Sequence, residues 1–515
     1  MKRAGLLFLF MIFLPAGLLS RPAEAAVAAG FDQATAAAVW SSALSYIAPR
    51  SLQPLTIPQM TLWGLNGLAA LDPDLTTNLQ DGELRLYGPN AMLLSVPAPS
   101  SSTDATAWGN AAAQIAAAAY NASPALQQAG TQEMISNFFD ELFNHFDPYS
   151  RYESPDRAAQ DELMILGLAG TGITLEAQNG HVVITHVAAD SPAANAGLTV
   201  GMQVLAMNGQ TTSTAQIDGL NAAMNGVSGS SVRFTVLDPA ASDGTDPPAP
   251  EPVTLTRALI PPPTVFTSPP LAGGIAVLRI TSFNKGTGDQ FSQALGTLMQ
   301  APAPPTALVI DLRGNRGGVL SQAVLVADAL MSSGLIAQTE GRDQDADQAF
   351  KAEGSDLTNG AHIAVLVDGR TASAAEILSS ALADNGRAVV IGSGTLGKGL
   401  VQTLDSLPDG GELFITWSRV LAARGWPLQG LGVMPQICTS LGTDAVQSQL
   451  GALDSGRNLM APAVAEERAL RPPVSVDAEL SLRNQCPAAI GTDLDVGAAL
   501  HVLTTPGAYA AALIH

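Results

Sequence analysis

The stretch IAVLVDGRTASAAEILSSALADNGRAVVI, residues 363–391, decides the fold class of this chain. Its apolar runs at 363–367 and 389–391 predict two strands, and the Ala- and Leu-rich stretch at 373–383 predicts a helix between them. A strand, a helix and a strand within about 30 residues form the unit that places two strands parallel in one sheet. We therefore predict an α/β layer with mostly parallel strands. The same alternation occurs upstream, with strands predicted at 275–280 and 307–312 and helices at 290–299 and 319–331.

Length and composition indicate a multidomain globular protein. The chain has 515 residues, too many for a single hydrophobic core, and 47% of them are hydrophobic. Charged residues make up only 13%, and 45 Asp and Glu outnumber 24 Lys and Arg to give a net charge of −21. A surface of that sign repels phosphate backbones, so no nucleic-acid partner is expected.

The segment 1–25 has the anatomy of a secretory signal peptide. A basic start at 1–3 is followed by an almost wholly apolar run at 4–19 and by small residues in an A-x-A arrangement at 23–25. The alternative is an uncleaved membrane anchor, but the run is short for a membrane span and Pro15 interrupts it. We expect cleavage at the end of this segment, and no later stretch is long and apolar enough to cross a membrane.

The two cysteines, Cys438 and Cys486, are candidates for a disulfide. An exported chain enters an oxidising compartment, where pairing is favoured, and the bond would staple the C-terminal segment to the part before it. The alternative is two unpaired buried thiols. No Cys-x-x-Cys or His-x-x-x-His is present, so no metal site is expected.

The composition and the hydrophobic pattern of the sequence change along the chain. The first part after the signal peptide is Ala-rich with few strand signals, and its apolar positions from Met134 to Phe146 share one helical face. Short β-type runs and Gly-rich turns then appear, with a further helical face formed by Ile217, Leu220 and Met224. The α/β alternation follows, and a C-terminal segment ends the chain. The expected bounds of these four parts are 26–160, 161–260, 261–445 and 446–515.

A glycine-rich turn, DLRGNRGG at 311–318, follows a predicted strand and precedes a predicted helix. Glycines allow backbone N–H groups to approach a ligand, and a helix N-terminus favours negative charge. These are the ingredients of an oxyanion hole. The alternative is an ordinary tight turn between a strand and a helix.

Ser373 and Lys398 are the candidate catalytic pair. Ser373 stands at a strand-to-helix corner, where its hydroxyl can be exposed and the N–H of Ala374 can bind an oxyanion; the alternative is a plain helix N-cap. A serine nucleophile needs a base, and a lysine serves if burial lowers its pKa. Lys398 lies between glycines and close to Leu400 and Val401, which fits desolvation, although a solvated surface lysine is the alternative. No histidine stands at a recognisable triad spacing, so a Ser-His-Asp mechanism is not supported.

Together and in this order, the segments resemble the C-terminal processing peptidases, a family of PDZ-containing serine proteases. The resemblance covers about residues 130–440, and the separations of 25 residues from Ser373 to Lys398 and of four from Lys398 to Gln402 fit the family pattern. The motifs that carry it are DPYSRY at 147–152, SPA at 191–193, AGL at 196–198, NG at 208–209, DLR at 311–313 with Asn315 and GG at 317–318, TASAAEI at 371–377, and GKG at 397–399 with VQ at 401–402.

The resemblance implies a role for each matching residue. Ser373 would be the nucleophile, Lys398 the general base, and Gln402 the side chain that orients the lysine amine. The oxyanion would be held by backbone N–H groups of Ala374 and of Gly317 or Gly318. The PDZ domain, 161–260, would bind the C-terminal carboxylate of a substrate and accept the peptide as an added strand. The residues implied for that binding are Gly170, Thr171, Gly172, Ile173, Ile217, Leu220 and Met224.

The fold that follows is an α/β multidomain protein with a helical N-terminal region, a β-rich PDZ domain with two helices, an α/β protease core and a C-terminal segment. The resemblance implies an exported, periplasmic endopeptidase that acts on C-terminal tails of proteins through an acyl-enzyme, with no metal or organic cofactor. Its partners would be proteins or peptides with accessible C-termini, and a homo-oligomer or an adaptor protein stays open. Two rival functions also stay open: an inert PDZ scaffold and a hydrolase of a non-peptide ligand.

Three positions depart from the family pattern. Ala375 stands where the family often has Ser, Arg316 where Pro is frequent, and Gly201-Met202 where Gly-Asp is common. None of these changes removes a catalytic group. They leave substrate preference and the details of PDZ docking undetermined.

Overall fold

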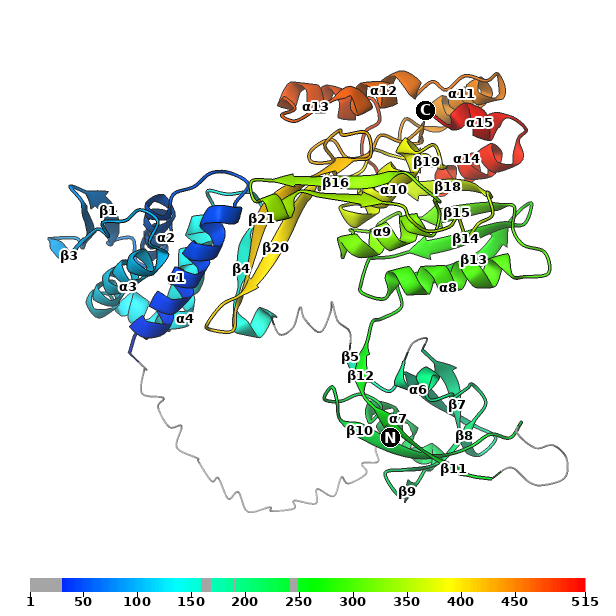
Figure 1. Cartoon of the computed structure of the whole chain (residues 1–515), viewed down its shortest axis with the longest axis horizontal. Helices are drawn as coiled ribbons and strands as arrows, with labels where there is room; N and C mark the ends of the chain where they lie inside the picture. Colours follow the sequence, from blue (N-terminus) through cyan, green and yellow to red (C-terminus); the bar gives the residue numbers. More distant parts are fainter. Residues whose placement is uncertain (1–29, 159–167, 189–190, 241–248, 515) are drawn as a thin grey trace, which may run out of the picture.

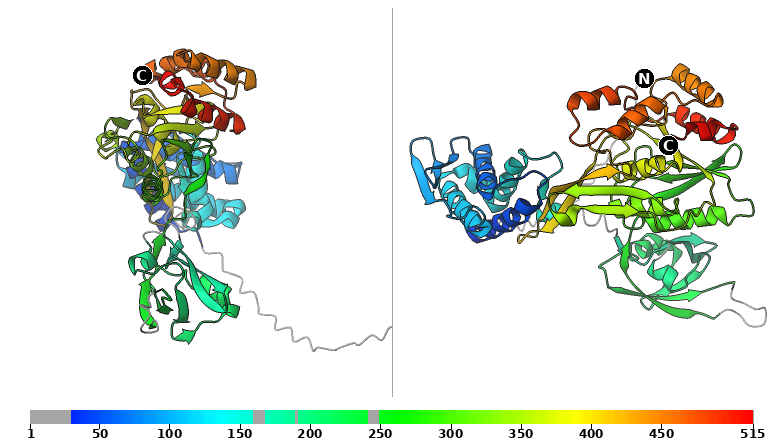
Figure 2. Two further views of the ribbon diagram at one scale, coloured as in Figure 1. Left: turned by 90° about the vertical axis from the view of Figure 1, so that its right-hand side faces the viewer. Right: turned by 45° about the horizontal axis from the view of Figure 1, so that its top comes forward.

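The computed structural model describes residues 30–158, 168–188, 191–240 and 249–514, and the predicted signal peptide lies outside these ranges. Within them the buried hydrophobic residues form four clusters, one in the N-terminal region, one in the middle region and two on opposite faces of a large sheet. Figures 1 and 2 show the N-terminal and middle regions projecting separately from the core that contains this sheet. Across the described ranges, no helix has the length and hydropathy of a membrane span.

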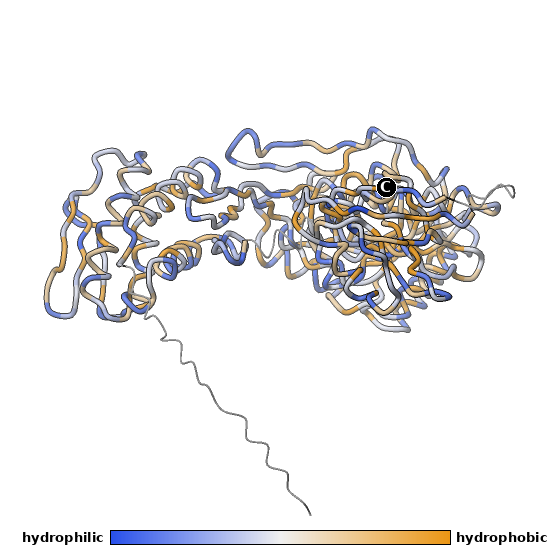
Figure 3. The backbone as a smooth tube through the Cα atoms, turned by 90° about the horizontal axis from the view of Figure 1, so that it is seen from below, coloured by the Kyte–Doolittle hydropathy of each residue, from blue (hydrophilic) through white to orange (hydrophobic). Residues whose placement is uncertain are grey.

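Four helices dominate the N-terminal region, as expected from its Ala-rich sequence. Hydrophobic and hydrophilic stretches alternate along them, which is the pattern of helices with one buried face (Figure 3). Gly130, with φ 77°, breaks the fourth helix just before the stretch whose apolar face was expected. That face is buried, from Met134 to Phe143. The helices are α1 (Gln33–Arg50), α2 (Ile57–Leu71), α3 (Ala105–Ala122) and α4 (Pro124–Phe143).

A three-stranded antiparallel sheet interrupts these helices, although the sequence showed few strand signals there. Its first two strands pair through the two-residue turn Asp81-Gly82, where both residues have positive φ. Asp-Gly is a standard dipeptide for such a hairpin, so the signal was present in the sequence. The strands are β1 (Thr76–Gln80), β2 (Glu83–Tyr87) and β3 (Met92–Pro97).

The middle region is a small β-rich domain whose main sheet has the strand order β11-β10-β8-β7-β6. Ser231–Leu237 and Glu251–Thr256 pair antiparallel as neighbouring strands of this sheet. A separate pair, β5 with β12, connects this domain to the rest of the chain. The elements are β5 (Leu168–Gly170), β6 (Ile173–Gln178), β7 (His181–Val187), α6 (Pro192–Asn195), β8 (Gln203–Met207), β9 (Gln210–Thr211), α7 (Ile217–Ala222), β10 (Ser231–Leu237), β11 (Glu251–Thr256) and β12 (Ala258–Ile260).

The core is a sheet of order β13-β14-β15-β18-β19-β22, in which every pair except β13–β14 is parallel. Successive side chains of a strand point to opposite faces, so each strand contributes to two hydrophobic clusters. One face packs against α8, α9 and α10, and the other against α11, α14 and α15. The elements are β13 (Val265–Leu271), β14 (Ile275–Ile280), α8 (Thr287–Met299), β15 (Ala307–Asp311), α9 (Leu320–Asp328), β18 (His362–Val367), α10 (Ala374–Asp384), β19 (Ala388–Gly392) and β22 (Ile437–Cys438).

The C-terminal helices therefore complete the core sandwich. Cys438 at the end of β22 and Cys486 form a disulfide, which fastens the segment after α13 to the sheet. The helices are α11 (Thr443–Asp454), α12 (Ala461–Ala469), α13 (Val476–Arg483), α14 (Asp493–Thr504) and α15 (Ala508–Ala512).

A second sheet, of order β17-β16-β21-β20, links the core to the N-terminal region. Its long β20–β21 hairpin reaches out from the core, and Leu407, Leu413 and Ile415 join the N-terminal hydrophobic cluster. A short strand, β4, pairs with β21 on the side opposite β20. The strands are β4 (Arg151–Glu153), β16 (Leu335–Gly341), β17 (Gln348–Lys351), β20 (Leu400–Ser406) and β21 (Glu412–Ala422).

Candidate active site

Ser373 occupies the sharp corner between β18 and α10. Its backbone has φ 55° and ψ −120°, a conformation that residues other than glycine rarely adopt and that costs on the order of 1–3 kcal/mol. The side chain is half-buried, and the residue is also the N-cap of α10. Ser373 is thus a helix N-cap, and this position does not conflict with its proposed role as a nucleophile. Strain of this kind is concentrated at functional sites because only the surrounding structure can maintain it.

A buried carboxylate joins the Ser373 corner to the Lys398 segment. Glu376, in the first turn of α10, has no exposed surface. Its Oε2 accepts the N–H of Ser373 at 2.7 Å and the N–H of Lys398 at 2.9 Å. Its Oε1 accepts the N–H of Gly397 at 2.7 Å and the hydroxyl of Thr395. Because the N–H groups of Ser373 and Lys398 bind the same oxygen atom, the backbones of these two residues lie close together.

The ionisation of Glu376 is set by opposing effects. Burial raises the pKa of its carboxyl, and the hydrogen bonds from Thr395, Gly397, Ser373 and Lys398 oppose that rise. Glu376 lies within the TASAAEI motif at 371–377, but no role was predicted for it from the sequence. Its position three residues after the N-cap is the signature of a capping box, which would have indicated a bond to the Ser373 N–H.

The surroundings of Lys398 lower the pKa of its amine. Burial lowers the pKa of its amine, the positive charge of Arg151 lowers it further, and Glu376 acts in the opposite direction. The Nζ atom lies 4.7 Å from the centre of the Tyr149 ring. Tyr149 and Arg151 belong to the segment that precedes the middle domain, so this lysine is contacted by one residue and electrostatically influenced by another that lie far from it in sequence.

A tight turn presents Tyr149 to the lysine. Oδ1 of Asp147 accepts the N–H of Tyr149 at 2.9 Å and the N–H of Ser150 at 3.0 Å, which is an Asx-type turn. The same oxygen accepts the hydroxyl of Thr416 at 2.7 Å, fixing the turn to β21. This turn is part of the DPYSRY motif at 147–152 that carries the family resemblance, but its contacts were not predicted from the sequence.

Gln402 lies on β20 beside this turn. Its Nε2 donates to the hydroxyl of Thr416 at 3.1 Å and to the carbonyl of Leu400 at 3.3 Å, so its Oε1 is the group left to accept a hydrogen bond. In the part of the chain that the structure describes, no hydrogen bond joins the Lys398 amine to Gln402 or to Ser373. Such contacts are often long without substrate and tighten in the bound complex.

The glycine-rich turn lies directly against the Ser373 corner. A Cβ placed on Gly317 would stand 2.7 Å from Cβ of Ser373 and 2.9 Å from the nitrogen of Ala374. The N–H of Gly317 itself donates to Oδ1 of Asn315 at 2.8 Å. Gly318 forms a parallel β-bridge with Phe283. In this bridge Phe283 bonds to the carbonyl of Gly317 and to the N–H of Val319, so the N–H of Gly318 itself is not used. Of the two alternatives from the sequence, Gly318 is therefore the donor that an oxyanion could use together with Ala374.

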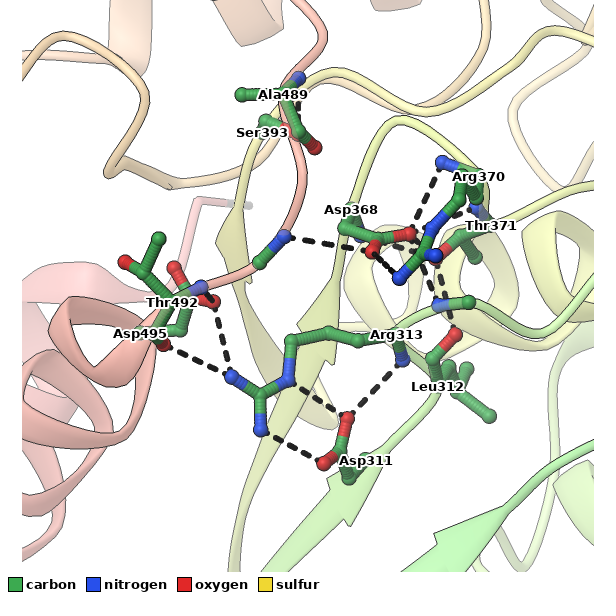
Figure 4. A network of polar contacts seen from close by, with 12 residues as sticks. Asp311, Leu312, Arg313, Asp368, Arg370, Thr371, Ser393, Ala489, Thr492 and Asp495 are labelled. Atoms are coloured by element: carbon green, nitrogen blue, oxygen red, sulfur yellow. Dashed lines mark hydrogen bonds and ion pairs between the residues drawn. The ribbon is translucent and has the colours of Figure 1, made fainter.

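A polar network holds the loops of the site in place (Figure 4). Oδ1 of Asp368 accepts the N–H of Gly314 at 2.9 Å and the N–H of Arg370 at 2.9 Å. These bonds join the glycine-rich turn to the loop that leads to Ser373. The hydroxyl of Ser393 donates to the carbonyl of Ala489 at 2.9 Å and accepts its N–H at 3.1 Å. The segment that follows Cys486 thus supports the loop that leads to Lys398.

Arg313 extends this network into the C-terminal helices. Its guanidinium pairs with Asp311 at 2.8 Å and with Asp495 at 3.1 Å, and it donates to the carbonyl of Thr492. The side chain of Asp495 is almost fully buried. The glycine-rich turn is therefore held by Asp368 on one side and by the C-terminal residues Thr492 and Asp495 on the other.

A small cavity opens beside the start of β20. Its volume is about 110 Å³, and it is lined by residues of the α1–α2 connection together with Phe146, Asp147, Leu400 and Thr416. Leu52 and Leu55 are the apolar residues that the connection contributes. The cavity is thus adjacent to the strand that carries Gln402.

The residues expected to bind peptide lie together in the middle domain. Ile173, Leu220 and Met224 are buried in its hydrophobic cluster, and Ile217 packs against that cluster. In the Gly170–Ile173 loop, Thr171 donates its N–H to the carbonyl of Met224 at 3.1 Å. The loop is therefore in contact with a residue of the predicted helix face, although α7 ends at Ala222 and Met224 follows the helix.

Comparison with known proteins gives two family matches. A model of peptidase family S41 matches residues 274–439, and a model of the PDZ domain matches residues 162–237. The chain is 32% identical over 310 residues to a carboxy-terminal-processing protease of Bartonella bacilliformis, covering 59% of this chain and 69% of the relative. It is 32% identical over 300 residues to a carboxyl-terminal-processing protease of Synechocystis, covering 56% of this chain and 67% of the relative.

Among solved structures, the photosystem II D1 C-terminal processing protease matches with 24% identity and a TM-score of 0.37. The match covers 76% of this chain and 97% of that protein.

Proposed function

The chain belongs to the family of carboxy-terminal-processing proteases, and from this premise we propose that it cleaves peptide bonds with a Ser373–Lys398 dyad. It is a serine-type endopeptidase with a PDZ domain, and its substrates are proteins or peptides. The observation that carries the proposal is the single Glu376 oxygen that binds the backbone N–H groups of both dyad residues. Residues 25 apart in sequence are thereby held at one point.

In the proposed mechanism, Oγ of Ser373 attacks the carbonyl carbon of the scissile bond while the neutral amine of Lys398 takes the hydroxyl proton. The tetrahedral oxyanion is bound by the N–H groups of Ala374 and Gly318. The protonated Lys398 then gives the proton to the leaving amine, and an acyl-enzyme on Ser373 remains. A water molecule, deprotonated by the same lysine, hydrolyses that ester and restores the serine.

Gln402 is proposed to orient the lysine. Because its amide nitrogen already donates to Thr416 and Leu400, its Oε1 accepts a hydrogen bond from the Lys398 amine once the site tightens around substrate. The lowered pKa of Lys398 supports its role as a base, since the neutral amine is populated at lower pH than in a solvated lysine.

The PDZ domain is proposed to select the substrate by its C-terminal tail and to control access to Ser373. The tail carboxylate would bind at the Gly170–Ile173 loop, and the peptide would add as a strand to β6. A deletion of this domain that left basal cleavage, substrate choice and the response to tail peptides all unchanged would contradict this role.

Export to the periplasm is proposed from the sequence of residues 1–25. The same compartment would favour the disulfide between Cys438 and Cys486. Mass analysis of the protein recovered from a periplasmic fraction tests both points, because it gives the mature N-terminus and the oxidation state together.

The catalytic proposal is tested by cleavage of an unfolded protein with an apolar C-terminal tail. We expect Ser373→Ala and Lys398→Ala each to lose cleavage by at least about a thousandfold while their unfolding curves stay close to wild type. The exposed Lys351→Ala serves as the control and should cleave normally. Wild-type rates in either dyad variant would assign the chemistry to other residues.

A further inference from the structure

One side chain closes the sheet edge on which the peptide is proposed to dock. β6 is the last strand of its sheet, so among the residues that the structure describes no further strand pairs with its outer edge. The N–H of Leu175 donates to Oδ1 of Asn221 at 2.9 Å, and Nδ2 of Asn221 donates to the carbonyl of Leu175 at 2.8 Å. These are the two bonds that a residue of an added antiparallel strand would make with Leu175.

The position of this contact matters for docking. Backbone groups of alternate residues in a strand point to the same edge, so Ile173 and Ala177 share the outer edge with Leu175. Leu175 is thus the central pairing position of the stretch expected to receive the peptide. A peptide strand cannot pair along that edge while Asn221 occupies the Leu175 groups.

A second set of contacts closes the same groove at its loop. The N–H of Thr171 donates to the carbonyl of Met224 at 3.1 Å, and the N–H of Gly226 donates to the carbonyl of Ala169 at 3.0 Å. Met224 and Ile173 are both buried in the hydrophobic cluster of this domain. The helix α7 and the residues after it therefore rest on β5 and β6 from the loop to the strand edge.

We propose that Asn221 is a latch that holds the peptide-binding groove closed until a substrate tail displaces it. The latch rests on the proposed function, because it assumes that tails dock on β6. Docking exchanges two internal hydrogen bonds for two bonds to the peptide, so these bonds contribute little net affinity. Binding strength must then come from the carboxylate and the apolar side chains of the tail, which makes the latch a filter against tails that lack them.

The size of the effect follows from the two bonds. Each neutral hydrogen bond contributes on the order of a 2- to 12-fold change in an equilibrium constant. Removing the latch should therefore tighten peptide binding by roughly 5- to 100-fold, because the Leu175 groups are then free in the unbound state.

The experiment uses the full chain carrying Ser373→Ala, so that bound peptide is not cut. Binding of a fluorescent peptide with an apolar C-terminus and a free carboxylate is measured by anisotropy, with and without Asn221→Ala. Ala222→Ser, at an exposed position of the same helix, is the matched control. Hydrogen exchange of the Leu175 amide is measured in parallel, because it reports on the contact itself.

We expect Asn221→Ala to exchange the Leu175 amide faster and to bind the peptide roughly 5- to 100-fold more tightly, while Ala222→Ser matches its parent in both. Unchanged exchange, or faster exchange with unchanged or weaker binding, overturns the latch. Asn221→Ser, whose shorter side chain cannot reach both Leu175 groups, must give the same direction if the alanine variant folds poorly. Cleavage by the chain with an intact Ser373 is measured separately. The binding experiment therefore tests the role of Asn221 alone, and the cleavage experiment tests the proposed proteolytic activity alone.

Discussion

The change Glu376→Gln tests whether this carboxylate positions the two catalytic segments. Its oxygens accept four hydrogen bonds, from the N–H groups of Ser373, Lys398 and Gly397 and from the hydroxyl of Thr395. An amide has one oxygen, and its NH2 cannot accept a bond. The least costly orientation keeps the oxygen on Ser373 and Lys398 and turns the NH2 toward the Thr395 hydroxyl, which leaves the Gly397 N–H buried without an acceptor. The expected loss of unfolding free energy is about 1–3 kcal/mol.

The effect on catalysis should exceed the effect on folding. Gly397 is the residue before the lysine, and a misplacement of about 1 Å at a reacting group costs about a hundredfold in rate. We therefore expect kcat/KM for a fluorogenic peptide to fall by about 10- to 100-fold, mostly in kcat, with the variant fully folded under the assay conditions. Guanidinium unfolding measures the stability and steady-state kinetics measures the rate.

Glu467→Gln is the matched control for that variant. Glu467 is also a buried carboxyl, and it accepts the N–H of Met434, which belongs to neither of the two segments that carry Ser373 and Lys398. Burial raises its pKa well above the usual range, so an uncharged amide is a close substitute. The control should retain its kcat. Wild-type kcat/KM in Glu376→Gln, or an equal loss in both variants, would refute the positioning role.

Two further changes test the geometry around the dyad. Gly317→Ala should reduce cleavage by more than about a hundredfold, because the new Cβ would lie 2.7 Å from Cβ of Ser373. Gly296→Ala on α8, whose Cβ would meet no atom within 4 Å, is the control and should cleave normally. A Gly317→Ala enzyme with normal kcat would contradict the close packing of Gly317 against Ser373. If the neutral Lys398 amine is the base, as proposed, kcat/KM should rise with pH through a pKa below the usual lysine value of 10.5. Arg151→Gln should move this rise to higher pH, because it removes a nearby positive charge. A rise that stays in place in Arg151→Gln would contradict the assigned cause.

The α/β core was predictable because its signals are local. The apolar runs on either side of Ser373 form β18 and β19, and the helix between them is α10. Parallel strands buried on both faces read as continuous apolar runs, and 363–367 is such a run. The N-terminal hairpin at Asp81-Gly82 also had a local signal, but the Ala-rich composition around it obscured the pattern.

The environment of the lysine was not predictable from local sequence. Its neighbours Tyr149 and Arg151 lie before the middle domain in the chain, and the pairing of β4 with β21 in the folded protein brings them to Lys398. The same limit applies to Asn221, whose contact with Leu175 joins a helix to a strand about 46 residues earlier. Glu376 lay within a quoted motif, yet its role became visible only when the Gly397-Lys398 backbone was placed against it.

The most direct test of the Ser373–Lys398 dyad is covalent labelling with a fluorophosphonate, a reagent that reacts only with an activated serine. After digestion, mass spectrometry identifies the labelled residue in the wild type, in Lys398→Ala and in the exposed-lysine control Lys351→Ala. We predict a single adduct on Ser373 in the wild type and in the control, and labelling slowed by at least about a hundredfold in Lys398→Ala. An adduct on another serine, or equal labelling of Ser373 without Lys398, would contradict the dyad.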